Sequence, residues 1–367
     1  MRHLFWMGCV VQASYKVQAV ARMLDTTVDS VRRYVDESGV EVARQESGPK
    51  VRQFSIENVF DLAAWRREHR PKITIKKRAI GTVYAPKGGV GKTTLTANIA
   101  SIFALMGLKT LVIDLDFQAN LTLAFGYDSE LTLEEARESG VPEERVVQYH
   151  LGHLVPGWPG GRASLSDVIK KPFGENGPHL IPSDLTLDRL DTILTYDAIE
   201  GKKSDLKIAA LIAEGIAGTN PLFDLSGYDV ILFDAAPAKN RMTRGALLAS
   251  DFVIAPVSLE RYSTKAVSYL SSVLQDMHDD VGRSPQLVMI GNFHVPNRLR
   301  VYSQVGKLST EYPGALLSVM VHRSEEFPKT LSEDEEQPPL VLARPTGGAA
   351  EQLHDVAREL LQKMGVI

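Results

Sequence analysis

The chain has 367 residues, 44% hydrophobic and 23% charged, a composition typical of a globular protein with one large domain and a smaller one. Its single cysteine, Cys9, excludes a disulfide framework and any metal site built from the cysteines of one chain. Because no run of about 18 apolar residues could span a bilayer, and the short apolar stretch near the start lacks a signal-peptide pattern, we expect a cytoplasmic protein.

The net charge of −4 is unevenly distributed along the chain. Residues 1–78 contain 15 Lys and Arg against 9 Asp and Glu, whereas the remainder contains 26 against 36. A basic front on an acidic body predicts that the front of the chain contacts an anionic partner.

Residues 1–70 have the pattern of a small helical unit. Apolar residues at helical spacing over 17–24 and again over 28–35, with a polar interruption between them, predict two helices joined by a tight turn. This is a helix-turn-helix pattern. Alternating residues around 47–49 predict a hairpin wing, and Ser55 is the expected cap of a third helix.

A basic stretch at 71–78 is interpreted as a connector, and an α/β domain follows over 79–367. Short apolar strands alternate there with helical segments, which predicts a mostly parallel sheet wrapped by helices. The predicted strands cover 79–85, 110–116, 179–182, 228–236, 251–258, 286–293 and 315–321.

A glycine-rich turn lies between the first of these strands and a helix predicted at about 93–106. This is the arrangement of a P-loop, in which glycines let backbone N–H groups converge on phosphate oxygens at a helix N-terminus. Lys92 is expected at the terminal phosphates, the Thr93 hydroxyl on Mg²⁺ and Thr94 within reach of phosphate. The alternative is a glycine-rich turn that arose by chance.

Carboxylates at strand ends are candidates for holding the metal. Asp234 follows an apolar strand, and its simpler interpretation is a helix cap. Asp114 lies closer to a strand interior and is a structural candidate, whereas Asp116 lies further out, where it could orient a water.

Four motifs, "KGGVGKTT", "DLDFQANLT", "YDVILFDAAP" and "DFVIAPVS", follow one another in this order. The chain from about residue 79 onward thereby resembles the deviant Walker A ATPases, and specifically the ParA family that partitions plasmids and chromosomes. The longer ParA proteins carry a winged-helix-like front domain that binds the operator of their own operon, and residues 1–70 are similar to it.

The resemblance implies particular roles for individual residues. Lys87 would reach the ATP of the partner subunit in an ATP-sandwiched dimer, and Lys92 would be the P-loop lysine. Asp116 would be associated with the hydrolytic water and the metal, Asp234 with Mg²⁺, and Asn292 would read adenine, although a loop-capping role is an open alternative. Nucleotide contacts fall on Lys87, Gly88, Gly89, Val90, Gly91, Lys92, Thr93, Thr94 and Asn292.

Departures from the family pattern affect two regions. Phe117 stands where the family usually has proline, so the segment after Asp116 is expected to have a different shape. Glu326 stands where many relatives carry a basic residue that contacts DNA. Arg298 and Arg300 are therefore the preferred candidates for a phosphate contact, with an ordinary solvated face as the alternative.

In the front unit, basic residues are candidates for contacts with DNA phosphates. Polar residues near the start of the second predicted helix are candidates for contacts with the DNA bases. A helix-turn-helix that only stabilises the fold is the alternative. The phosphate candidates are Arg32, Arg33, Lys50 and Arg52, and the base-reading candidates are Thr27, Asp29 and Ser30.

The resulting expectation is a Mg²⁺-dependent partition ATPase on the bacterial nucleoid, not on a membrane. ATP would close a homodimer that binds nonspecific DNA, and a ParB-type partner would stimulate slow hydrolysis. Two alternatives stay open: a MinD-type ATPase that patterns a membrane, and a transcriptional repressor that uses the nucleotide only as a signal. The mixed charge of the last 17 residues predicts a helix that closes the fold instead of a basic membrane helix.

Overall fold

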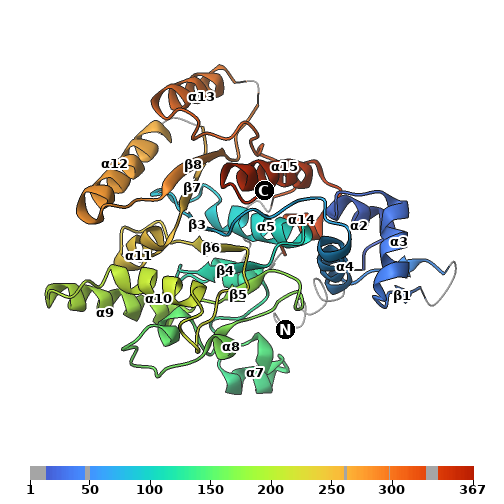
Figure 1. The fold of residues 1–367 in the computed structure, drawn as a ribbon, viewed down its shortest axis with the longest axis horizontal. Helices are drawn as coiled ribbons and strands as arrows, with labels where there is room; N and C mark the ends of the chain where they lie inside the picture. The colour runs from blue at the N-terminus through green and yellow to red at the C-terminus, as the bar shows by residue number, and fades with distance from the viewer. Residues whose placement is uncertain (1–13, 46–49, 260–262, 297, 328–337) are drawn as a thin grey trace.

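The computed structural model describes residues 14–45, 50–259, 263–296, 298–327 and 338–367 (Figure 1). Cys9 and the predicted wing tip at 47–49 lie outside these ranges. The described residues build a central sheet with helices on both of its faces, and a smaller helical unit, which we call the front unit, packs at one side.

The central sheet has six described strands, all parallel, in the order β5-β4-β6-β3-β7-β8. The order of the strands and the helices on both faces of the sheet (Figure 1) confirm the predicted P-loop NTPase-like α/β fold. The strands are β3 (Ala79–Val83), β4 (Thr110–Asp114), β5 (His179–Ile181), β6 (Val230–Asp234), β7 (Phe252–Val257) and β8 (Gln286–Gly291).

The prediction of a seventh strand, at 315–321, is wrong. This segment runs beside β8 and exchanges backbone hydrogen bonds with Met289, but it forms only isolated bridges. Its ladder breaks because the backbone N–H groups of Ser318 and Val319 donate to the Glu359 carboxylate, at 2.7 and 2.8 Å, instead of to a neighbouring strand.

The strands are buried on both faces, as expected for a parallel sheet between helical layers. In β6, Val230 and Leu232 join one apolar cluster and Ile231 and Phe233 the other, following the period of two. The helices that cover the sheet are α5 (Lys92–Leu105), α9 (Asp188–Ile199), α10 (Leu206–Ile216), α11 (Arg241–Ala249), α12 (Ser263–Val281), α13 (Leu299–Glu311), α14 (Leu340–Ala343) and α15 (Gly348–Lys363). Shorter helices α6 (Asn120–Ala124), α7 (Leu133–Ser139) and α8 (Leu165–Val168) lie in the connections.

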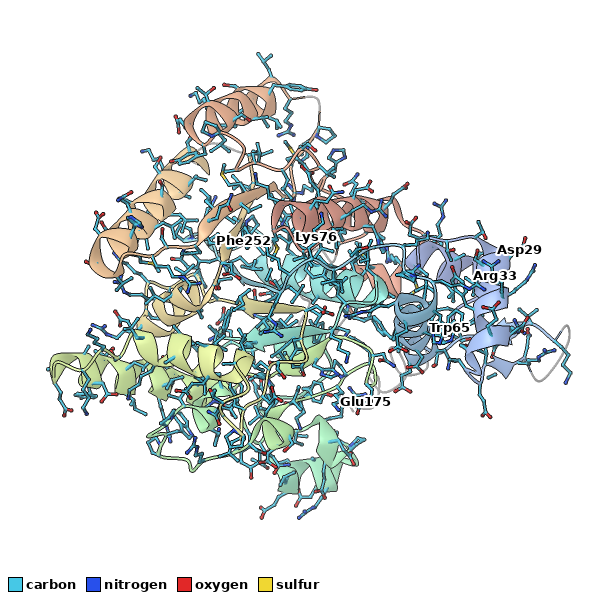
Figure 2. All side chains as sticks on the ribbon, in the orientation of Figure 1. Asp29, Arg33, Trp65, Lys76, Glu175 and Phe252 are labelled. Atoms are coloured by element: carbon cyan, nitrogen blue, oxygen red, sulfur yellow. The ribbon has the colours of Figure 1, made fainter. Side chains whose placement is uncertain are left out.

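The front unit has its elements at the predicted positions. It contains α2 (Val17–Met23), α3 (Val28–Ser38), the antiparallel pair β1 (Ala43–Arg44) and β2 (Arg52–Gln53), and α4 (Ile56–His69). Ser55 caps α4 in a capping box with Asn58, which satisfies donors that the helix start leaves free. Trp65 of α4, labelled in Figure 2, packs on Tyr34 of α3, and the two ring centroids are 5.6 Å apart.

The front unit and the α/β part, residues 79–367, share one apolar cluster. Phe173 from the α/β part packs between Phe60 of α4 and Phe125 after α6, with centroid separations of 5.9 and 5.6 Å. Arg66 of α4, only 5% exposed, donates to the backbone carbonyls of Leu24 and Leu105. The two predicted parts therefore pack as one body across a buried, hydrogen-bonded junction.

Candidate nucleotide site

The glycine-rich turn joins β3 to α5 at the carboxyl edge of the sheet. Gly91 precedes α5 with φ +79°, a left-handed conformation that favours glycine. A Cβ at Gly91 would meet a Phe293 ring carbon at 2.4 Å and the Asn292 amide nitrogen at 2.7 Å. Because glycine provides no side-chain cap, the first backbone N–H groups of α5 are left for a ligand.

Lys92 begins α5 and is nearly buried, with 8% of the residue exposed. Its Nζ makes one long hydrogen bond, 3.5 Å, to the backbone oxygen of Lys87. Burial lowers the pKa of Lys92, and the nearby Asp234 and Asp116 oppose that change. A desolvated cation beside an uncapped helix start is an arrangement that attracts phosphate.

Lys87, Gly88 and Gly89 are exposed on the outer side of the same turn. Asn292 lies beneath the turn, 2% exposed, and its Nδ2 donates to the backbone oxygen of Val90 at 2.8 Å. The two lysines of the turn thus have opposite environments, and Asn292 supports the loop whether or not it also reads adenine.

Asp234 ends β6 beside α5 and is almost fully buried. Burial raises its pKa to about 6, although hydrogen bonds from Thr93 and Thr96 act in the opposite direction. Asp114 ends β4 directly opposite Asp234 in the strand register, and burial together with the Asp234 charge raises the pKa of Asp114. Two neighbouring buried carboxylates create a strongly negative edge, which favours a bound cation.

The two carboxylates differ in how many hydrogen bonds they accept. Asp114 accepts from the backbone N–H of Asp116 at 3.1 Å, and from the N–H and the hydroxyl of Thr122 at 3.0 and 2.8 Å. Asp234 accepts fewer, one from Thr93 and one at 2.9 Å from Thr96, one turn after Lys92 on α5. Asp114 is therefore well satisfied by the protein, and Asp234 is the carboxylate better placed to hold a metal.

These residues fit a magnesium nucleotide. Lys92 and the start of α5 supply the anion-binding groups, while Thr93 and Asp234 supply the hard oxygen ligands that Mg²⁺ prefers. When bound, Mg²⁺ would neutralise charge on the phosphate oxygens. In such a complex, Lys92 and the start of α5 would hold and orient the phosphates.

Comparison with known families decides the identity. Residues 78–287 match the AAA_31 family, described as an AAA domain. The chain belongs to this family and is a ParA-type ATPase. It is 25% identical over 284 residues to the cell division protein PomZ of Myxococcus xanthus, covering 76% of each chain.

A second relative of this ParA-type ATPase is the chromosome-partitioning ATPase Soj of Thermus thermophilus, 30% identical over 205 residues, which cover 56% of this chain and 64% of the relative. Among solved structures, cobyrinic acid a,c-diamide synthase of Mycobacterium smegmatis with bound ADP and magnesium superposes with a TM-score of 0.58. The alignment covers 79% of this chain and 96% of that one at 18% identity, so the likeness concerns the fold. The bound ADP and magnesium belong to that synthase.

The segment after Asp116 forms a tight turn in this ParA-type ATPase. Asp116 is partly exposed, and its Oδ1 accepts from the backbone N–H of Gln118 at 3.1 Å. Ala119 adopts φ +52°, a left-handed conformation that costs a non-glycine residue about 1 kcal/mol or more. Phe117, the departure from proline, is partly exposed beside this strained turn.

Two of the predicted DNA-contact residues of the ParA-type ATPase belong to the segment around α13. Arg298 and Arg300 are exposed at the start of α13. Glu326 is partly buried beside Gly347, and its Oε2 has no hydrogen-bond partner among the described residues. In the part of the chain that the structure describes, no helix is both long and apolar enough to cross a membrane.

In the front unit, Arg33 and Asp29 project from α3 (Figure 2). Arg32 pairs with Asp29 at 2.9 Å and Arg52 pairs with Asp36 at 2.6 Å, so these two candidates have acidic neighbours. The remaining candidates are Thr27, which caps α3 by accepting from the backbone N–H of Ser30, and the exposed Arg33 and Lys50.

Sequence reasoning missed Thr96, Thr122 and the junction arginine Arg66. Thr122 is the last residue of the motif "DLDFQANLT" but carried no predicted role, whereas Thr96 and Arg66 belong to none of the four motifs. Thr96 lies at helical spacing after Lys92 on the same side of α5, and that spacing is the one signal that could have indicated its contact with Asp234.

Proposed function

We propose that this protein is a partition ATPase, in which ATP closes a homodimer that binds DNA. The single observation that carries the proposal is the opposite placement of the two loop lysines. Lys92 is buried where its own nucleotide would lie, whereas Lys87 is exposed on the outside of the same loop. An exposed lysine next to a phosphate loop suits a role across a subunit boundary.

In this proposal, each residue near the loop has a separate task. Lys92 and the N-terminus of α5 hold the phosphates of their own subunit, and Thr93 and Asp234 hold the metal. Lys87 stabilises the phosphates of the partner subunit, Asp116 orients the attacking water, and Asn292 contacts adenine. The names of PomZ and Soj, a cell division protein and a chromosome-partitioning ATPase, support the biological setting.

The DNA-binding tasks would be divided between two surfaces. The front unit would bind an operator through Thr27, Ser30, Arg32, Arg33, Lys50 and Arg52, and thereby repress its own operon. Arg298 and Arg300 on the ATPase part would contact nonspecific DNA, which would place the dimer on the nucleoid in the cytoplasm. A ParB-type partner would stimulate hydrolysis and release.

The deciding experiment compares Lys87→Ala with Lys92→Ala for ATP binding, ATP-dependent dimerisation and turnover. We expect Lys92→Ala to lose nucleotide binding, and Lys87→Ala to bind ATP but to fail in dimerisation and turnover. Lys109→Ala, at an exposed lysine directly before β4 and therefore at the opposite edge of the sheet, is the matched control. If Lys87→Ala dimerises with ATP and hydrolyses it normally, the cross-subunit role is wrong.

A further inference from the structure

A cavity outside the nucleotide site lies where the front unit, the connector and the ATPase part meet. Its volume is about 560 Å³, within the range of small-molecule sites. The ATPase part contributes Leu105 and Met106, at the C-terminal end of α5. Since α5 has 14 residues, this end lies roughly 20 Å from the nucleotide loop, and the cavity is separate from the nucleotide site.

The floor of the cavity is aliphatic. Met23 and Leu24 of the front unit face it together with Ile73 and Ile75 of the connector and Leu105 of α5. None of the described residues that line the cavity is Phe, Tyr or Trp. A nucleobase would therefore find no aromatic partner to stack on, and the floor favours a flexible aliphatic group.

The mouth of the cavity is cationic. Lys72 and Arg358 line it, about half exposed, and both interact with Asp25, at 3.9 and 2.9 Å between side-chain atoms. Asp25 is the only acidic side chain among the described lining residues. A mouth with more positive than negative charge is complementary to an anion.

Two further lining residues, Arg66 and His354, add polar groups to the inner part of the cavity. Arg66 lies deeper, where its guanidinium is already bonded to two backbone carbonyls. His354 lines the cavity from α15, and its buried Nε2 has no hydrogen-bond partner among the described residues. A ligand with a polar end could satisfy that nitrogen, which is otherwise costly to bury.

We propose that this cavity binds a small amphipathic anion, an aliphatic carboxylate whose chain covers the floor. Its carboxylate would replace the Asp25 side chain on Arg358 and Lys72. Asp25 lies in the turn between α2 and α3 with φ +46°, so the ligand would release the contact that ties this turn to α15. The site would then be a place where a metabolite acts on the front unit, independently of the nucleotide.

The test uses octanoate as the probe on the full chain, with binding measured by isothermal titration calorimetry. The wild-type protein should bind one octanoate saturably. Arg358→Gln should weaken binding about fivefold, since a half-exposed ion pair contributes up to about 1 kcal/mol. Lys363→Gln, which removes the same charge from the same helix outside the cavity, should bind like the wild type.

Asp25→Asn is the decisive variant because it should act in the opposite direction. Asparagine tolerates the left-handed backbone at this position, and it frees Arg358 and Lys72 from a competing carboxylate, so octanoate should bind more tightly. Thr74→Trp, an exposed lining position, should block the cavity and abolish binding. Uncharged 1-octanol should bind more weakly than octanoate.

Three results would each overturn the proposal. These are no saturable octanoate binding to the wild type, equal affinity of the wild type, Asp25→Asn and Arg358→Gln, and octanol binding as tight as octanoate binding. Circular dichroism of every variant shows whether a lost signal reflects a misfolded chain, and Lys363→Gln shows whether loss of charge alone is responsible.

Discussion

The nucleotide edge of the sheet and the outer face of the front unit are both rich in charge, but they differ in burial. At the nucleotide edge, Lys92, Asp114 and Asp234 are buried, and Thr122 and Thr96 donate hydrogen bonds to the two carboxylates. On the front unit, Arg32 and Arg33 are exposed, and Arg32 pairs with an acidic neighbour that is itself exposed.

This difference shows why one region indicates a specific chemistry and the other does not. Burying an ionised group is costly, so a cluster of buried charges persists only where a function requires it. Exposed charges cost little and are common on any surface. Between these regions lies the junction, where Arg66 is a buried charge that has a structural task.

The largest effect is expected at the junction. Arg66→Met keeps much of the packing but leaves the carbonyls of Leu24 and Leu105 without their donor. Each buried unsatisfied carbonyl costs about 1–3 kcal/mol, so the free energy of unfolding should fall by roughly 3 kcal/mol in urea denaturation. Arg22→Met, at an exposed arginine of α2, is the control; an equal loss in both variants would contradict a structural task for Arg66.

A buried charge at the nucleotide edge should instead destabilise the free protein. Because burial raises the pKa of Asp234 to about 6, above the value in an unfolded chain, this group stabilises the fold below about pH 4 and loses that contribution as pH rises through 6. Asp234→Asn should therefore raise the free energy of unfolding at pH 7, without nucleotide, by on the order of 2 kcal/mol, while ATP turnover falls.

The measurement for Asp234→Asn is the difference from the wild type in urea denaturation at pH 5 and at pH 7.5. The stabilisation should be larger at pH 7.5. A variant that is less stable than the wild type at both pH values would show that Asp234 does not pay a desolvation penalty in the folded state.

Thr96 provides a finer test of the same edge. Thr96→Val removes the hydroxyl that donates to Asp234, whereas Thr96→Ser retains it. A hydrogen bond to a charged group contributes about 1.5 kcal/mol, so Thr96→Val should require roughly tenfold more Mg²⁺ for half-maximal turnover. The acidic limb of the pH profile of turnover should also move to higher pH in Thr96→Val, because the hydrogen bond that this variant lacks lowers the pKa of Asp234. Equal behaviour of both variants would exclude Thr96 as a positioning residue.

The smallest effects are expected on the exposed face of the front unit. Arg33→Ala should weaken duplex DNA binding about fivefold and reduce the slope of log affinity against log salt by about one. Arg32→Ala should have a smaller effect because Asp29 already competes for that guanidinium. Fluorescence anisotropy across a salt series measures both. Arg70→Ala, whose guanidinium is paired with Glu37, is the control, and identical slopes in all variants would argue against DNA contact.

The nucleotide site could be predicted from the sequence where its signals are local. The turn before Lys92 and the strand that ends in Asp234 are each contained in about ten consecutive residues, and backbone geometry alone brings strand ends to one edge. The bond from Asn292 to Val90 joins residues about 200 positions apart. The pairing of Asp114 with Asp234 depends on strand order, which no local pattern contains.

Contacts between distant parts of the chain also explain two further findings, the absence of the predicted seventh strand and the core that the front unit shares with the ATPase part. Segment 315–321 has the apolar pattern of a strand. However, the N–H groups of Ser318 and Val319 donate to Glu359 on α15, which lies 41 and 40 positions later in the chain. Residues 1–70 have the pattern of a small helical unit, and their apolar face continues into the core of the ATPase part through Phe60 and Phe173, which no local pattern contains. Both results are set by tertiary contacts.

The row of Phe60, Phe173 and Phe125 has a consequence for how this protein can change in evolution and in the laboratory. A front unit taken from another protein would have to match the surface around Phe173 before it could fold in place. A chain cut at the connector would leave Phe173 and the end of α5 open to water and prone to aggregate. Under the proposed operator-binding role, new DNA specificities would therefore be more accessible through substitutions on α3 than through exchange of the whole unit.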